Sequence, residues 1–179
     1  LVGSEMCIRD RYNRGETIRA TTSFLMADST TPDGDYIKPQ TNPTNTDCWN
    51  GKAYTPLNQL TPGRTKYGTN NNARIFRYAD VLLMNAEAKI KNGKNGDAPF
   101  NEVRRRAKMP ELTNVTFQQV IDERRMELMC EWGERYNDLV RTGLAKTELK
   151  GWSEDKALLP LPFNQYTQIP DLLKEPKDE

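Results

Sequence analysis

Four glutamates lie close together in one stretch of the chain, and paired carboxylates are the groups most suited to acid–base chemistry. They are Glu123, Glu127, Glu131 and Glu134. General acid–base catalysis by such a pair needs two carboxyl groups at a matched separation, in surroundings that drive their pKa values apart. These glutamates share a predicted helix with several arginines, which favours a solvated or ion-paired structural face. We therefore expect no catalytic residue, and hydrolysis remains an alternative interpretation.

A second group of candidate residues is aromatic. Trp49, Tyr54 and Tyr67 stand among asparagines and threonines in the first half of the chain, and Trp152 lies nearer its end. An aromatic ring can stack on the apolar face of a sugar ring, while amide and carboxylate side chains bind hydroxyl groups. These four residues are the predicted ligand contacts. The alternative is that the rings hold the loops against the rest of the protein, and the sequence favours neither.

The residue types exclude several kinds of site. The chain has three cysteines, Cys7, Cys48 and Cys130, with no CxxC pair and no histidine. Neither a mixed Cys/His zinc site nor a four-cysteine site can therefore form, and we expect no metal and no cofactor. Cys130 falls in a helical apolar pattern and is predicted to be a buried thiol. A pair between Cys48 and Cys130 would need an oxidising compartment, and nothing in the sequence demands it.

Charge and composition narrow the class of protein. The chain has 179 residues, enough for one domain, and a net charge of +1 from 26 basic and 25 acidic side chains. This balance gives no signature of nucleic-acid binding, and the three arginines at 104–106 are predicted to be a helix face. Hydrophobic residues make up 36% of the chain and the mean hydropathy is −0.84, so much of it is loop or part of its core is missing.

Three helices are predicted from residue 78 onward. The first covers residues 78–92, where apolar residues recur every three or four positions. The second covers residues 98–109. The third begins with Thr116 and Gln119, which form a capping-box pattern, and runs without a break to Gly143.

The rest of the chain is predicted to be mostly loop. Residues 12–77 are rich in Asn, Thr, Pro and Gly, with short strands expected at 18–24 and 73–76. The tail at residues 158–162 is expected to be extended because of its prolines. Residues 1–11 resemble a translated sequencing-adapter fragment, which predicts that they are not part of the natural protein. The alternative is an ordinary disordered terminus.

Four motifs in the helical half resemble the SusD/RagB family. They are FRYADVLLMNAEA at residues 76–88, NEVRRRA at 101–107, the stretch that begins IDERRMEL at 121–143, and LPLP at 159–162. They occur in the order and at the spacing of the family, which makes them specific together although none is specific alone. The residues after 173 depart from the usual end of the family.

The resemblance implies a mainly α fold, a SusD-like, tetratricopeptide-related helical scaffold with a loop-rich extension. It predicts a non-native segment at 1–11, a loop-rich ligand-side region at 12–77 and the helical C-terminal region of the family at 78–179. Members of this family carry an N-terminal portion with a signal peptide and a lipid-anchored cysteine. No signal peptide is found here, so that portion is expected to be missing.

The resemblance also implies a function. Such proteins lie on the outer membrane of Bacteroidota, lipid-anchored and exposed at the cell surface, above a SusC-like TonB-dependent transporter. They bind oligosaccharides, or peptides in some members, and deliver them to the transporter without catalysis. We expect this function here, with no nucleic-acid partner. The alternatives are a helical-repeat interaction module without a small-molecule ligand and a glycan hydrolase.

Overall fold

A computed structural model describes residues 13–39, 48–62, 74–132, 134–158 and 163–168. The chain divides into two compact units, residues 1–135 and 136–179. The boundaries predicted from composition, at residues 11 and 77, mark changes of sequence character and remain predictions. Among the helices of the described part, none is long and apolar enough to cross a membrane.

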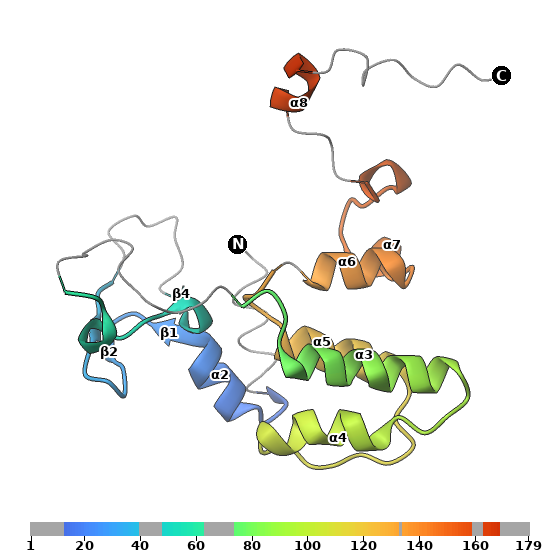
Figure 1. Cartoon of the computed structure of the whole chain (residues 1–179), viewed down its shortest axis with the longest axis horizontal. Helices are drawn as coiled ribbons and strands as arrows, with labels where there is room; N and C mark the ends of the chain where they lie inside the picture. The colour runs from blue at the N-terminus through green and yellow to red at the C-terminus, as the bar shows by residue number, and fades with distance from the viewer. Residues whose placement is uncertain (1–12, 40–47, 63–73, 133, 159–162, 169–179) are drawn as a thin grey trace. The chain divides into compact units, whose positions relative to one another are not determined.

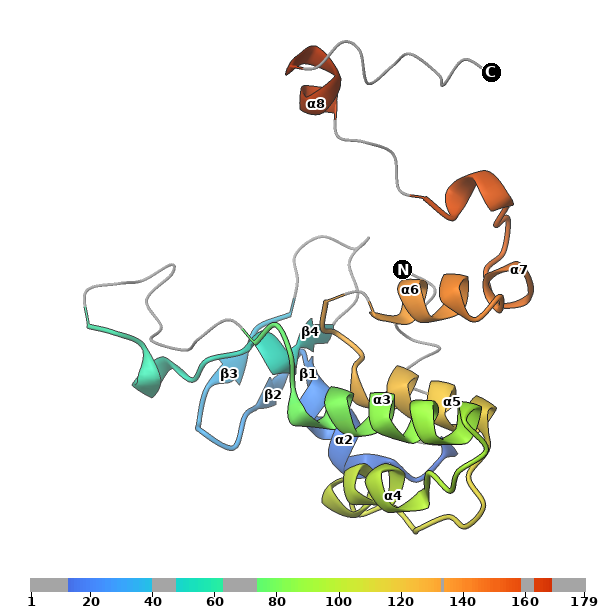
Figure 2. The same ribbon diagram turned by 45° about the vertical axis from the view of Figure 1, so that its right-hand side comes forward.

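The core of the first unit is formed by α3 (Tyr78–Lys91), α4 (Asp97–Arg106) and α5 (Phe117–Glu127), which lie side by side in Figures 1 and 2. The fully buried side chains of this core include Leu83 and Ala86 from α3, Phe100 from α4 and Val120 from α5. These residues recur at the three- and four-residue spacing that places them on one helix face. The three helices predicted at this core are confirmed, as is the capping box between Thr116 and Gln119.

The third predicted helix is interrupted, so the prediction of one continuous helix to Gly143 is wrong. α5 ends at Glu127, and α6 (Glu134–Arg141) begins seven residues later. Cys130, predicted to be buried within the helix, is half-buried between the two helices and has a left-handed backbone with φ 65°. The backbone carbonyl of Glu127 accepts hydrogen bonds from Lys52 and Arg77, and that of Cys130 accepts one from Asn50. These side chains replace the amides that would continue the helix.

In the residues before α3 that the structure describes, the chain forms one short helix and two small sheets. The elements are α2 (Thr17–Ser23), β1 (Phe24–Met26), β2 (Ser29–Thr30), β3 (Tyr36–Ile37), β4 (Cys48–Asn50) and the 3-10 turns η1 (Gly51–Ala53) and η2 (Leu57–Gln59). β1 pairs antiparallel with β4, and β2 with β3.

The two strands predicted before α3 are corrected by the structure. The strand expected at 18–24 is mostly helix, because Ala20 and Ser23 share the buried face of α2 at helical spacing. Residues 74–76 form no strand, and Ala73 lies outside the described residues.

The second unit contains α6 from Tyr136 onward, α7 (Ala145–Glu148), the 3-10 turn η3 (Glu154–Lys156) and α8 (Phe163–Gln168). Asp138 is buried in α6 and pairs with Arg141 one turn later, at 2.6 Å. The extended tail predicted at residues 158–162 lies, after Leu158, outside the described residues.

Candidate functional site

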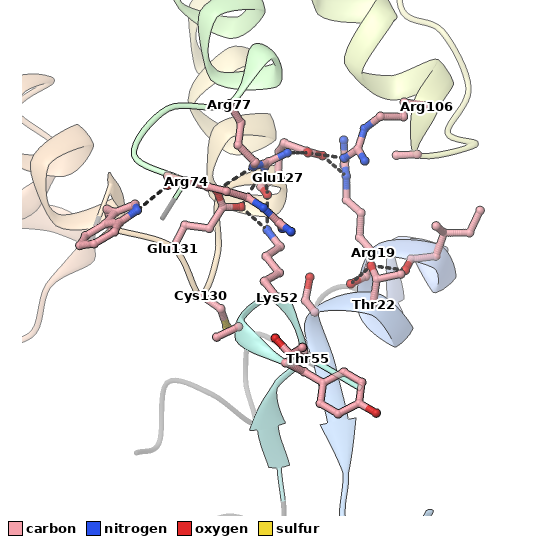
Figure 3. A pocket seen from close by; sticks show the side chains of 17 residues that line it. Arg19, Thr22, Lys52, Thr55, Arg74, Arg77, Arg106, Glu127, Cys130 and Glu131 are labelled. Carbon is pink, nitrogen blue, oxygen red and sulfur yellow. Dashed lines mark hydrogen bonds and ion pairs between the residues drawn. The ribbon is translucent and has the colours of Figure 1, made fainter. Parts of the chain in front are cut away.

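A pocket of about 690 Å³ opens in the first unit where α2, η1 and the C-terminal ends of α4 and α5 meet (Figure 3). We call it the arginine pocket, since four arginines and a lysine line it. The buried residues of its floor include Arg19, Ser23 and Glu127. The exposed residues of its rim include Arg74, Arg106 and Trp132. Residues from both ends of the first unit therefore build one concave surface.

Glu127 is the centre of the ion pairs at the floor (Figure 3). Its carboxylate accepts hydrogen bonds from Arg19 Nε and Arg77 Nη1, each at 2.9 Å, and it also pairs with Arg106. The Glu127 side chain is 1% exposed. A buried charge of this kind is tolerated only when it is paired and hydrogen-bonded, so the three arginines account for its position.

Further buried ion pairs hold Arg19, the partner of Glu127, in place. Arg19 also donates to Glu16 at 2.9 Å and to Glu123 at 2.5 Å. Glu123 accepts in addition from Arg104 Nη1 at 2.7 Å. All four side chains are almost fully buried, so their positions are set by one another and not by solvent.

Towards the rim, the pairs are more exposed. The Glu131 carboxylate accepts hydrogen bonds from Lys52 Nζ at 2.6 Å and from Arg77 Nε at 2.7 Å. Lys52 also donates to the backbone carbonyl of Glu127. These contacts join three segments: η1, the residues before α3 and the end of α5.

The ion pairs shift the pKa values of the groups that form them. Burial alone would raise the pKa of Glu127, but the charges of Arg19, Arg106 and Arg77 outweigh it and lower that pKa. Burial would likewise raise the pKa of Glu131, and hydrogen bonds from Arg77 and Lys52 lower it instead. Burial lowers the pKa of Lys52 despite the neighbouring Glu131. Both glutamates are therefore strongly ionised near neutral pH.

Aromatic rings and a hydroxyl group complete the lining. The Trp132 side chain lies at the rim, held by a hydrogen bond from Nε1 to the Arg74 carbonyl at 2.6 Å. Tyr54 is half-buried, and its hydroxyl bonds Thr31 and Asp35, so its ring is fixed in place. The Ser23 hydroxyl is buried and has no hydrogen-bond partner in the described part of the chain.

Comparison with known proteins identifies the family of this chain. The sequence model of the SusD family matches residues 10–171. The chain belongs to the SusD family. The mainly α, SusD-like fold predicted from the sequence is confirmed by the solved structures that resemble it.

Two solved structures and two curated relatives resemble the chain. Surface glycan-binding protein A from Bacteroides thetaiotaomicron has a TM-score of 0.71 and 28% identity over 93% of this chain and 40% of that one. The protein of the same name from Bacteroides uniformis has a TM-score of 0.65 and 27% identity over 87% and 37%. A SusD-like protein of Formosa agariphila is 33% identical over 56% of this chain and 24% of its own. Starch-binding protein SusD of Bacteroides thetaiotaomicron is 38% identical over 44% and 14%. This SusD-family chain thus spans less than half the length of these relatives.

The four predicted ligand contacts are not gathered in one place. Tyr54 lines the arginine pocket. Trp49 is exposed on β4, opposite Leu25 of β1, and is not part of the lining. Trp152 belongs to the second unit, and Tyr67 lies outside the described residues. All four remain predictions.

Sequence reasoning missed most of the pocket in this SusD-family chain. Trp132 falls within the stretch predicted as one continuous helix to Gly143, but α5 ends before it and its side chain is 64% exposed. Arg19 and Lys52 lie more than seventy residues before their partners on and just after α5. A periodicity pattern carries no signal for pairs this far apart. Glu123, Glu127 and Glu131 form ion pairs, one of the two arrangements expected for them. The other, a solvated face, is wrong for Glu123 and Glu127, which are buried.

Proposed function

We propose that this chain is the glycan-binding part of a cell-surface protein, and that it binds an oligosaccharide for uptake. The observation that carries this proposal is the match to two solved structures that are named surface glycan-binding proteins, at TM-scores of 0.65 and 0.71. One curated relative is named for starch binding. Peptides are the second ligand class that we expect for the family.

The arginine pocket is the proposed binding site. Its volume falls within the roughly 300–1,000 Å³ of most small-molecule sites. The rings of Trp132 and Tyr54 offer surfaces on which a sugar ring can stack, and Thr22 and Thr55 add hydroxyl groups. In this proposal α2, η1 and the segment before α3 supply one wall, and the ends of α4 and α5 supply the other.

We infer binding without hydrolysis. A glycosidase acid must carry a proton near neutral pH, which requires a raised pKa. The pKa of Glu127 and that of Glu131 are both lowered by neighbouring cations. The oxygens of both carboxylates are also occupied by arginine and lysine donors. These features favour a scaffold role for the glutamates.

For the whole protein we propose a position on the outer membrane through a lipid anchor, and delivery of the ligand to a SusC-like TonB-dependent transporter. Co-purification of the tagged protein with such a transporter from outer-membrane extracts would support this partner. Recovery of the protein without any transporter, under conditions that preserve a known pair of this kind, would contradict it.

The test of glycan binding is isothermal titration of the 179-residue chain with maltoheptaose and a panel of other oligosaccharides. Trp132→Ala should weaken binding roughly fivefold or more, since a stacking contact contributes on the order of 1 kcal/mol. Tyr36→Ala is the matched control, because Tyr36 is exposed on β3 and outside the pocket. Trp49→Ala tests the predicted contact on β4.

Three other outcomes separate the rival functions. Turnover of the glycan that disappears in Glu127→Gln would favour a hydrolase. Binding to a protein partner with no glycan affinity would favour a helical-repeat interaction module. Glycan affinity that survives Trp132→Ala unchanged would place the site elsewhere in the chain.

A further inference from the structure

The arginine pocket carries more positive charge than its own ion pairs neutralise. Among the residues that the structure describes, five basic and two acidic side chains line it. When the buried partners Glu16, Glu123 and Arg104 are included, six basic side chains face four acidic ones. Two positive charges therefore remain in a concave site, in a chain whose total net charge is only +1. Concave walls of low dielectric concentrate such a field.

Arg74 is one source of this excess. Its side chain lines the pocket (Figure 3), and its guanidinium has no ion-pair partner among the described residues. Its backbone carbonyl, however, is held by the Trp132 indole. The backbone of Arg74 is thus held by the Trp132 side chain at the rim, while the charge of its guanidinium is left available to a ligand.

Arg106 is the second source of the excess positive charge. Its side chain is 63% exposed although one of its nitrogens pairs with Glu127. A guanidinium has five N–H donors, so this pairing leaves further donors on an exposed side chain. Arg74 and Arg106 reach the pocket from separate elements, the segment before α3 and the end of α4. Two arginines in a concave site suit the fork geometry with which guanidinium groups bind oxyanions.

The floor offers an independent indication of a ligand. Ser23 is 1% exposed, lines the pocket, and its Oγ lacks a hydrogen-bond partner in the part of the chain that the structure describes. A buried hydroxyl without a partner costs stability, so it is usually satisfied by water or by a bound group. A ligand oxygen in the pocket would satisfy it.

We propose that the arginine pocket binds an oxyanion carried on a sugar, a carboxylate or a sulfate ester, so that the preferred ligand is an acidic oligosaccharide. This inference rests on the proposed glycan-binding function. Trp132 and Tyr54 contact the sugar faces, Arg74 and Arg106 bind the anionic group, and Ser23 donates to a deeper oxygen. Uronates and sulfated sugars share this chemistry, and the test separates them.

The experiment compares ligands that differ only in charge. Isothermal titration of the 179-residue chain uses a trimer of galacturonic acid and its methyl ester, and a sulfated oligosaccharide and its desulfated form. Each acidic ligand that the pocket accepts should bind at least about tenfold more tightly than its neutral counterpart at low salt, and the difference should shrink as salt rises. Preference for one pair identifies the oxyanion as carboxylate or sulfate.

Arginine variants locate the anion. Arg74→Gln should lower affinity for the acidic ligand about tenfold and lower affinity for the neutral ligand much less, and Arg106→Gln should act in the same direction. Arg105→Gln is the matched control, because Arg105 is the neighbouring residue on α4 and pairs with Glu111 outside the pocket. Because Arg74 has no ion-pair partner among the described residues, its variant should retain the fold, which circular dichroism would check.

The possible outcomes distinguish failure of the acidic-ligand inference from failure of the proposed glycan-binding function. Equal affinity for charged and neutral ligands, or loss in Arg105→Gln equal to that in Arg74→Gln, would overturn the inference while glycan binding stands. If no oligosaccharide of either kind binds, the glycan-binding function fails and the inference fails with it.

Discussion

At the scale of single residues, Glu127 determines how the first unit is joined. It is buried, and its partners Arg19, Arg77 and Arg106 come from α2, from the segment before α3 and from the end of α4. Replacing a buried ion pair completely can be neutral, but removing one partner leaves the others buried and uncompensated. The ion pairs of Glu127 should therefore contribute more to the free energy of unfolding than an exposed pair such as Arg105–Glu111.

The variant Glu127→Gln should lower the free energy of unfolding by about 3–5 kcal/mol, because Arg19 would keep its buried charge without this counter-ion. Chemical denaturation followed by circular dichroism measures the change. Glu111→Gln is the control, since its pair with Arg105 is exposed and should contribute at most about 1 kcal/mol. A similar small loss for both variants would show that the Glu127 pairs are energetically neutral.

The lowered pKa values of Glu127 and Glu131 predict how stability depends on pH. A carboxyl group whose pKa is lower in the folded than in the unfolded state stabilises the fold fully above its unfolded pKa, about 4.3. That contribution disappears as the pH falls through the lower, folded value. Urea midpoints should thus be level above about pH 5 and fall below about pH 4.

Glu131→Gln removes one of these carboxyl groups and should make the acid decline shallower. Glu102→Gln, an exposed position on α4, is the comparison variant and should leave the decline as it is. Parallel acid declines in all three proteins would mean that other carboxyl groups govern the pH dependence.

At this scale the sequence predicted the kind of interaction in the site, but not which residues form it. Glutamates interleaved with arginines on one predicted helix made ion pairs one of the two expected arrangements. Which arginine meets which glutamate depends on contacts across about one hundred residues, as between Arg19 and Glu127. Helix periodicity describes only neighbours within a few turns, so it could not reveal the pocket or the role of Trp132.

At the scale of elements, two features shape the pocket: the end of α5 and the approach of η1 to α2. The apolar pattern continues past Glu127, so the sequence predicted helix there, but side chains from elsewhere bind the carbonyls at the break. The helices α3 and α5 were predictable because they bury a regular face. The break depends on tertiary contacts and was not.

Gly51 permits the close approach of η1 to α2. A Cβ atom at this position would lie 2.5 Å from the backbone oxygen of Thr22, too close for the two segments to keep their spacing. Gly51→Ala should therefore destabilise the first unit by about 1–3 kcal/mol and weaken ligand binding, since both segments line the pocket.

Thermal unfolding and titration measure these two effects together. Asn58→Ser changes an exposed position of η2 that lies outside the pocket lining, and it should alter neither. An unchanged melting temperature in Gly51→Ala would show that the turn can move away from α2 without cost.

At the scale of the whole molecule, the chain leaves one side of α3 apolar and exposed. Tyr78, Val81 and Met84 recur at three-residue spacing and are 68%, 48% and 43% exposed, and Phe76 just before them is 73% exposed. Contiguous apolar surface of this kind favours self-association. The chain also spans at most 40% of the solved relatives it resembles.

The double variant Val81→Lys/Met84→Lys should reduce self-association of the isolated chain and leave its unfolding midpoint nearly unchanged, because both positions face solvent and lysine is a good helix former. Light scattering after size-exclusion chromatography measures the association. Leu83→Lys, on the buried face of the same helix, should instead unfold the protein. Undiminished association in the double variant would show that another surface is responsible.

The convergence of distant segments on Glu127 has a consequence for the order of events during folding. α3, α4 and α5 are neighbours in the sequence, so they can assemble by closing short loops. The contact between Arg19 and Glu127 spans 108 residues, and a loop of that length closes only at a greater entropic cost. We therefore expect the pocket to be completed late, after the three helices have formed, so that the proposed ligand binding would report that the chain has reached its native state.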